Sequence, residues 1–148
     1  MVDPIDITPQ ASTIHDTNAL DATPLAPTTG LNMTFYTLQA ADWTNGITFL
    51  NTGHEVVVVM SKSANVVTTT AQCAVACDQG FKSPQHDVIA SQTAGSVTPT
   101  FKVIGQFQTS RYNQTIGAAQ LPNRVLVTFA GDTGNVSIAV LQTPTVGQ

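Results

Sequence analysis

Short runs of β-branched and apolar residues, separated by turn-forming residues, follow one another along the chain after residue 30. The run 55–60 is apolar at every position after its first residue, which predicts a strand that is buried on both faces. The other runs are rich in Val, Ile, Thr and Phe, which is typical of strands in a packed sheet. We predict strands at 33–38, 47–50, 55–60, 65–76, 87–90, 100–104, 124–129 and 136–141.

Turn-forming residues between these runs indicate how the strands connect. Asn45-Gly46 is a strong turn dipeptide, and a Gly-Asp-Thr-Gly-Asn stretch at 131–135 predicts a hairpin between the last two runs. We expect 65–76 to lie beside 55–60, and we expect loops at 78–96, around the short strand 87–90, and at 113–123. No segment after residue 30 has a helical period with caps. The pattern therefore predicts an all-β protein, a single antiparallel β-sandwich or small barrel of about seven or eight strands.

Residues 1–30 differ from the rest of the chain in composition and pattern. They hold four of the chain's eight prolines, and their apolar residues stand singly between polar ones. Proline fixes φ and holds the preceding residue extended, so we predict an extended N-terminal arm (1–30) before a β-sandwich domain (31–148). A disordered tail is the alternative. The single apolar side chains favour an arm that binds another protein surface through Ile5, Ile7, Ile14, Leu20 and Leu25.

Composition excludes several classes of function. Charged residues are only 9% of the chain, and no Lys or Arg precedes Lys62 although six acids do. A surface of this kind is a poor partner for nucleic acid or an anionic membrane. No apolar run approaches the length of a membrane span, and the acidic start lacks the apolar core of a signal peptide, so we expect synthesis and folding in a cytoplasm.

Candidate chemistry is sparse. His86-Asp87 supplies half of a hydrolytic dyad, but no nucleophile motif such as Gly-x-Ser-x-Gly accompanies it. Cys73 and Cys77 would be about 13 Å apart in a strand, too far for a disulfide, so we expect buried thiols. Two cysteines without a nearby histidine do not make a zinc site. We therefore expect no enzyme activity, no metal and no cofactor.

Three residues of the β domain are candidates for a protein interface. Trp43, the sole tryptophan, is placed on a short loop, where it is either a binding hot spot or a core residue. Arg111 and Tyr112 form a similar pair in a polar loop, where the alternative is a surface arginine stacked on a ring.

The order of the turns and strands resembles that of small β-sheet proteins encoded among the head genes of tailed bacteriophages. The shared motifs are the Asn-Gly turn at 45–46, the Phe-Leu-Asn-Thr-Gly turn at 49–53, the valine-rich run 55–60, Gly-Gln-Phe at 105–107, Arg-Tyr-Asn at 111–113, and the closing runs 125–129 and 138–141. The resemblance covers about residues 31–142. The long arm, an insertion at 114–123 and the cysteine pair depart from the family pattern.

Members of this family with known roles are capsid decoration, or cement, proteins. The resemblance implies a virion protein on the outer capsid surface that binds the major capsid protein, neighbouring decoration subunits and its own copies, often as a trimer. Two alternatives remain: another virion part, such as a tail, head-completion or fibre-tip module, and a carbohydrate-binding β-sandwich. The latter would need exposed aromatic rings on one face.

Overall fold

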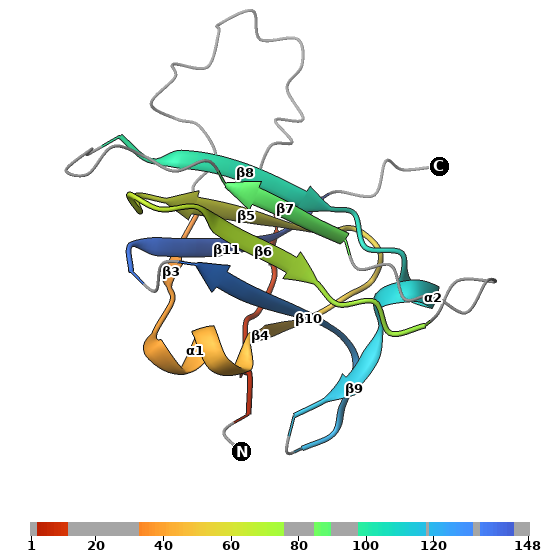
Figure 1. The fold of residues 1–148 in the computed structure, drawn as a ribbon. Coiled ribbons are helices and arrows are strands. Elements are labelled where there is room, and N and C mark those ends of the chain that lie inside the picture. Colours follow the sequence, from red (N-terminus) through yellow and green to blue (C-terminus); the bar gives the residue numbers. More distant parts are fainter. Residues whose placement is uncertain are drawn as a thin grey trace, which may run out of the picture.

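Two β-sheets pack face to face in this protein (Figure 1). The structure is a computed structural model that describes residues 3–11, 33–75, 85–89, 98–117, 119–131 and 134–143. The helices are α1 (Ala40–Asn45) and α2 (Thr109–Tyr112). The strands are β1 (Ile5–Asp6), β2 (Gln10–Ala11), β3 (Tyr36–Thr37), β4 (Ile47–Leu50), β5 (Glu55–Ser61), β6 (Val67–Ala71), β7 (Gln85–Ile89), β8 (Thr100–Gly105), β9 (Gln114–Ile116), β10 (Leu121–Gly131) and β11 (Val136–Gln142).

Sheet A is built around the 11-residue strand β10, and sheet B around the two seven-residue strands β5 and β11. Sheet A has the order β1-β4-β10-β6-β7, with β9 also paired to β10. Sheet B has the order β2-β11-β5-β8, with β3 also paired to β11. All pairs are antiparallel except β1 with β4 and β2 with β11. The prediction of an all-β sandwich is confirmed; the described ranges hold more strands than predicted because four of them are only two or three residues long.

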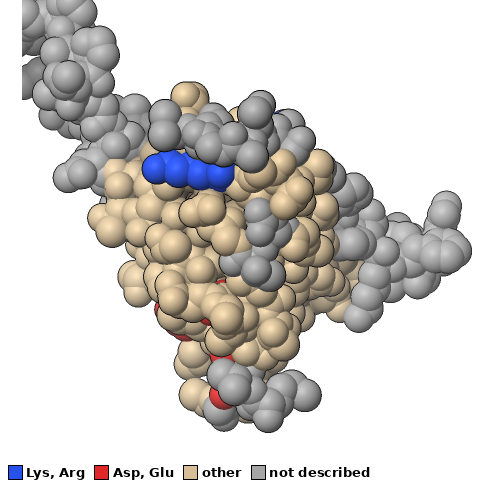
Figure 2. Space-filling view, turned by 60° about the vertical axis from the view of Figure 1, so that its left-hand side comes forward, with Lys and Arg blue, Asp and Glu red and all other residues tan. Residues whose placement is uncertain are grey.

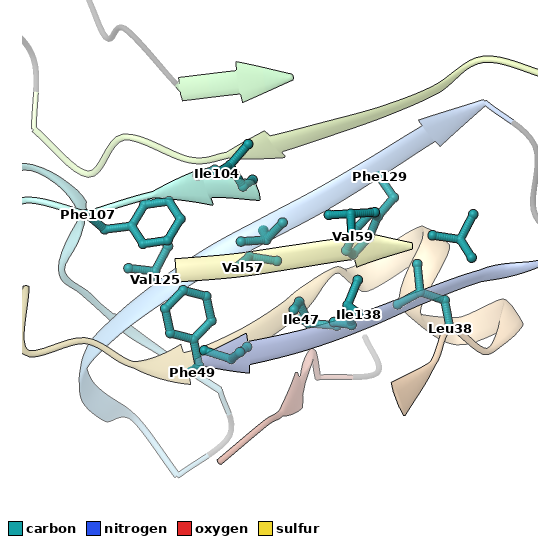
Figure 3. Close-up of a cluster of buried hydrophobic side chains, with 14 of the residues drawn as sticks. Leu38, Ile47, Phe49, Val57, Val59, Ile104, Phe107, Val125, Phe129 and Ile138 are labelled. Atoms are coloured by element: carbon teal, nitrogen blue, oxygen red, sulfur yellow. The ribbon is translucent and has the colours of Figure 1, made fainter. Parts of the chain in front are cut away.

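The core lies between the sheets and is formed by alternate residues of the central strands (Figure 3). Side chains alternate between the two faces of a strand, so β5 sends Val57 and Val59 inward from sheet B, where both are fully buried. Aromatic rings fill one end of the core, where Phe107 lies 5.5 Å from Phe49 and 5.6 Å from Tyr112 between ring centroids. The prediction of a strand buried on both faces is met in part: Val57 and Val59 on the core face are fully buried and Val58 on the outer face is buried, whereas Val56 and Met60 on the outer face are half-buried.

Two predicted strand pairings are wrong. The runs that became β10 and β11 do not form a hairpin, since β10 lies in sheet A and β11 in sheet B. Likewise β6 does not lie beside β5; it pairs with β10 and β7 in sheet A. The physical reason is the same in both cases. The two β-rich runs that flank a turn each need one side that faces the core. Both sheets of a sandwich provide such a side, so the second run can either stay in the same sheet or cross to the other.

Several local predictions also need correction. Trp43 lies on helix α1 and not on a loop, because the carboxylate of Asp42 accepts the backbone N–H of Gln39 at 2.7 Å and so stabilises the first turn. Gly46, at φ 79°, ends this helix instead of forming a hairpin turn. The predicted loop 113–123 contains β9 and the start of β10, and Arg111 and Tyr112 lie on α2. The predicted strand 33–38 is reduced to the two residues of β3.

One buried hydroxyl in sheet A leads to a stability prediction. Thr69 faces the core from β6 with 0% exposure, and within the described part of the chain its Oγ1 has no hydrogen-bond partner. We expect Thr69→Val to raise the free energy of unfolding by about 1 kcal/mol, because it removes an unsatisfied buried polar group while keeping the branched shape. Chemical denaturation measures the change. Thr70→Val, on the half-buried outer face, is the matched control and should change stability by less than about 0.5 kcal/mol. A loss of stability in Thr69→Val would contradict the prediction.

Candidate functional site

Sheet B carries an apolar outer face that becomes exposed toward the edge strand β8. Its register places Phe101 beside Met60 and Val103 beside Val58, on the side of the sheet opposite to the core. Phe101 is 52% exposed and Val103 is 61% exposed, whereas Val58 is buried. Large apolar side chains with this exposure are typical of contact surfaces when they adjoin one another.

Phe35 extends this apolar face across the sheet. Phe35 comes just before β3, and two strands, β11 and β5, lie between β3 and β8 in the sheet. Even so, the ring centroids of Phe35 and Phe101 are 6.3 Å apart, with an angle of 58° between the rings. Phe35, Val56 and Met60 are half-buried, so each still presents part of its surface. We name this surface the β8 patch and define it as Phe35, Val56, Met60, Phe101 and Val103.

No charged side chain belongs to the β8 patch. Lys102 lies between Phe101 and Val103 in sequence and alternates to the other side of the strand. Two of the described acids, Asp42 and Glu55, are buried, which lowers the exposed charge further. Figure 2 shows a face of the molecule on which uncharged surface predominates, with one basic stretch near its upper margin and a few acidic spots lower down. A partner would therefore contact the β8 patch through apolar packing and shape more than through charge.

The predicted interface residues of the β domain do not form a common surface. Trp43 is half-buried on α1 and packs edge-on against Phe129, 5.9 Å between ring centroids, and its Nε1 finds no partner among the described groups. Tyr112 is buried in the core, so its ring is not available to a partner. Arg111 is half-buried on α2, and its carbonyl accepts the N–H groups of residues 74 and 75. Helices α1 and α2 lie at opposite sides of the sandwich (Figure 1).

The predicted arm residues that the structure describes contact the chain's own sheets. Ile5 lies on β1 and is 37% exposed, and Ile7 packs against the core. Ile14, Leu20 and Leu25 lie outside the described residues. Residues 3–11 are thus part of the folded sandwich in this structure.

Sequence reasoning missed the β8 patch, although it predicted the strand that carries most of it. In the stretch 100–104, Phe101 and Val103 share one face while Ile104 occupies the other. Both faces carry apolar residues, so the alternation alone does not tell which face meets the core. Only the packing of Ile104 into the core identifies Phe101 and Val103 as outward-facing.

Neither buried carboxylate is arranged for catalysis. Tyr36 donates its hydroxyl to Asp42 Oδ2 at 2.8 Å, and burial, together with this hydrogen bond and the negative charge of Asp42, raises the pKa of Tyr36. The phenol therefore keeps its proton at neutral pH and acts as a structural donor. Glu55 accepts hydrogen bonds from the turn that precedes it, which is also a structural role.

A surface hollow of about 600 Å³ lies beside sheet A. Asn45 and Gln120 give it amides, and Pro4 and Leu126 give it apolar surface. Asp3 is the one ionisable side chain among the described residues that line it, so it offers no acid–base pair. Across the described ranges, no group of three or more His, Cys, Asp or Glu residues is placed to hold a metal ion.

No family model, no curated protein and no solved structure matches this chain. Neither helix in the part of the chain described has the length and apolar character needed to cross a membrane.

Proposed function

We propose that this chain is a virion structural protein that binds the outside of a tailed-phage capsid and bridges subunits of the major capsid protein. The order of turns and strands that resembles decoration proteins supports this proposal. The observation that carries it is the β8 patch, an exposed and uncharged apolar surface centred on Phe101 and Val103. A protein that stabilises a shell by contact alone needs such a surface and needs no reactive groups.

The chemistry of the β8 patch favours protein over other partners. Apolar contact with aromatic side chains is the pattern of the buried centre of a protein interface, from which charged residues are depleted. A nucleic acid would need a basic surface, and the β8 patch has no Lys or Arg. We assign the β8 patch to the contact with the major capsid protein.

One observation favours carbohydrate binding as a second candidate. Phe35 and Phe101 place two aromatic rings on one outer face, which a sugar-stacking site would require. Their rings are inclined by 58°, however, and their neighbours in the β8 patch are Val and Met, which offer no hydrogen bonds to sugar hydroxyls. Protein contact therefore accounts for the β8 patch better.

The test is cosedimentation of the full chain with purified, expanded capsids that lack their decoration protein. We expect saturable binding at a fixed number of copies per capsomer, with hundreds of copies on each particle. Capsids that have not expanded serve as the control for surface specificity. Absence of binding, or binding at only a few copies per particle, would overturn the proposal and point to a tail or head-completion part.

A further inference from the structure

Residues 3–11, which we name the N-terminal strap, connect the edges of the two sheets. Its first part, β1, pairs in parallel with β4 at the edge of sheet A, and its second part, β2, pairs in parallel with β11 in sheet B. Ile7 lies between the two pairings and packs against the core. Figure 1 shows this segment running along the side of the sandwich from the labelled N-terminal end. The strap therefore closes one open side of the sandwich.

An acceptor site formed by β4 and β10 of the sandwich holds the first half of the strap. Arg124 of β10 binds Asp6 with two nitrogens, Nε to Oδ1 at 3.0 Å and Nη2 to Oδ2 at 3.2 Å. Thr48 of β4 donates its hydroxyl to Asp6 Oδ1 at 3.1 Å, and its carbonyl accepts the N–H of Ile7 at 2.7 Å. The Arg124 side chain is only 15% exposed, so this carboxylate meets a largely sheltered guanidinium.

The second end of the strap is recognised in the same manner, by groups that belong to the sandwich. The Gln10 side chain donates to the carbonyl of Thr34 at 2.7 Å and accepts the N–H of Thr34 at 2.9 Å. This pair of bonds fixes β2 beside β11 although the two strands share only two register positions. The acceptor thus recognises a short pattern of a carboxylate, an isoleucine and an amide at fixed spacing.

We propose that copies of this chain exchange their N-terminal straps, so that the acceptor of one copy holds residues 3–11 of another. The strap contacts described above, within the described ranges, all join it to the acceptor, so they can form within one chain or between two. Residues 12–32 join the strap to the sandwich, and a chain of that length reaches on the order of 70 Å when extended, which is enough to reach an adjacent copy. In a closed ring of copies, each acceptor receives the strap of a neighbouring copy. The exchange therefore keeps all the strap contacts and also links the copies to one another. It concerns contact between copies of the chain and does not depend on the proposed capsid role.

Two charge-reversal variants test the exchange. Asp6→Arg and Arg124→Asp each place like charges together, whether the strap binds its own chain or another copy of the same variant. In a mixture of the two, every strap matches the acceptor of the other variant, and only of the other variant. We expect the mixture to form hetero-oligomers, with association at least on the order of tenfold tighter than in either variant alone, measured by native mass spectrometry and analytical ultracentrifugation.

The double variant Asp6→Arg/Arg124→Asp is the control, because it restores the pair within one chain as well as between chains. It should fold and associate like the unmodified protein. The proposal is overturned if the double variant is folded while the mixture shows no association beyond that of its two components. It is also overturned if the unmodified protein is a monomer at every concentration measured. If the single variants fold only when mixed, the exchange is supported directly. None of these outcomes involves capsids, so they do not bear on the proposed function.

Discussion

Replacing Phe101 with aspartate is expected to abolish binding to expanded capsids and to leave the fold unchanged. The side chain is 52% exposed, so a carboxylate at this position stays hydrated in the free protein. In the proposed contact it would be removed from water without a partner, which costs several kcal/mol. We expect the dissociation constant to rise by at least about 100-fold, since every 1.4 kcal/mol is a factor of ten. Cosedimentation over a range of protein concentrations measures the change.

The matched control for this variant is Leu50→Asp. Leu50 is 42% exposed on β4, and it points outward from sheet A, away from the β8 patch. The same apolar-to-acid change there should leave capsid binding within about threefold of the unmodified protein, because exposed positions outside an interface contribute little. Equal losses in the two variants would show that the effect comes from charge and not from the β8 patch. Unchanged binding by Phe101→Asp would remove the β8 patch from the proposed contact.

Glu55 is expected to be the most sensitive polar residue for stability. It is 1% exposed, and its Oε2 accepts the backbone N–H groups of Thr52 at 2.7 Å, Gly53 at 3.1 Å and His54 at 3.1 Å. Its Oε1 accepts the hydroxyl of Thr52 at 2.8 Å and the amide of Gln142 at 3.3 Å. One carboxylate therefore holds the whole turn between β4 and β5.

We expect Glu55→Ala to lower the free energy of unfolding by about 3–5 kcal/mol, because several donors lose their acceptor and a cavity forms at the start of β5. That is a large share of the roughly 5–15 kcal/mol by which domains are stable. Urea denaturation followed by tryptophan fluorescence measures it. The control is Gln142→Ala, which removes one donor from the same carboxylate and should cost no more than about 1 kcal/mol. A loss below about 1 kcal/mol in Glu55→Ala would show that water replaces the carboxylate without penalty.

The fold class could be predicted because each strand needs apolar residues that face the core. This requirement appears in the sequence of each strand by itself. The strand that became β5 could be located from its uninterrupted apolar run, although Val56 and Met60 on its outer face are less buried than that run predicted. Pairing was less predictable, because it depends on which sheet the chain enters after each turn. Helix α1 was not predicted, because its six residues are too few to show a helical period.

The candidate site was predictable only in part, for a different reason. Trp43 and Tyr112 were chosen for residue type, yet type does not tell a core ring from an exposed one. Phe101 and Val103 needed knowledge of which face of β8 meets the core. The ion pair between Asp6 and Arg124 joins residues far apart in the sequence, and no local pattern indicates it.

The distribution of strands between the sheets has a consequence for how the chain is made. The chain crosses between the sheets several times: β4 is in sheet A, β5 in sheet B, β6 and β7 in sheet A, β8 in sheet B, β9 and β10 in sheet A, and β11 in sheet B. Strand β11, which follows all the others along the chain, lies inside sheet B between β5 and the short strands β2 and β3. Most of the chain must therefore leave the ribosome before either sheet can be completed. Contacts between such distant segments slow folding, so we expect the sandwich core to form only after β10 and β11 have been synthesised.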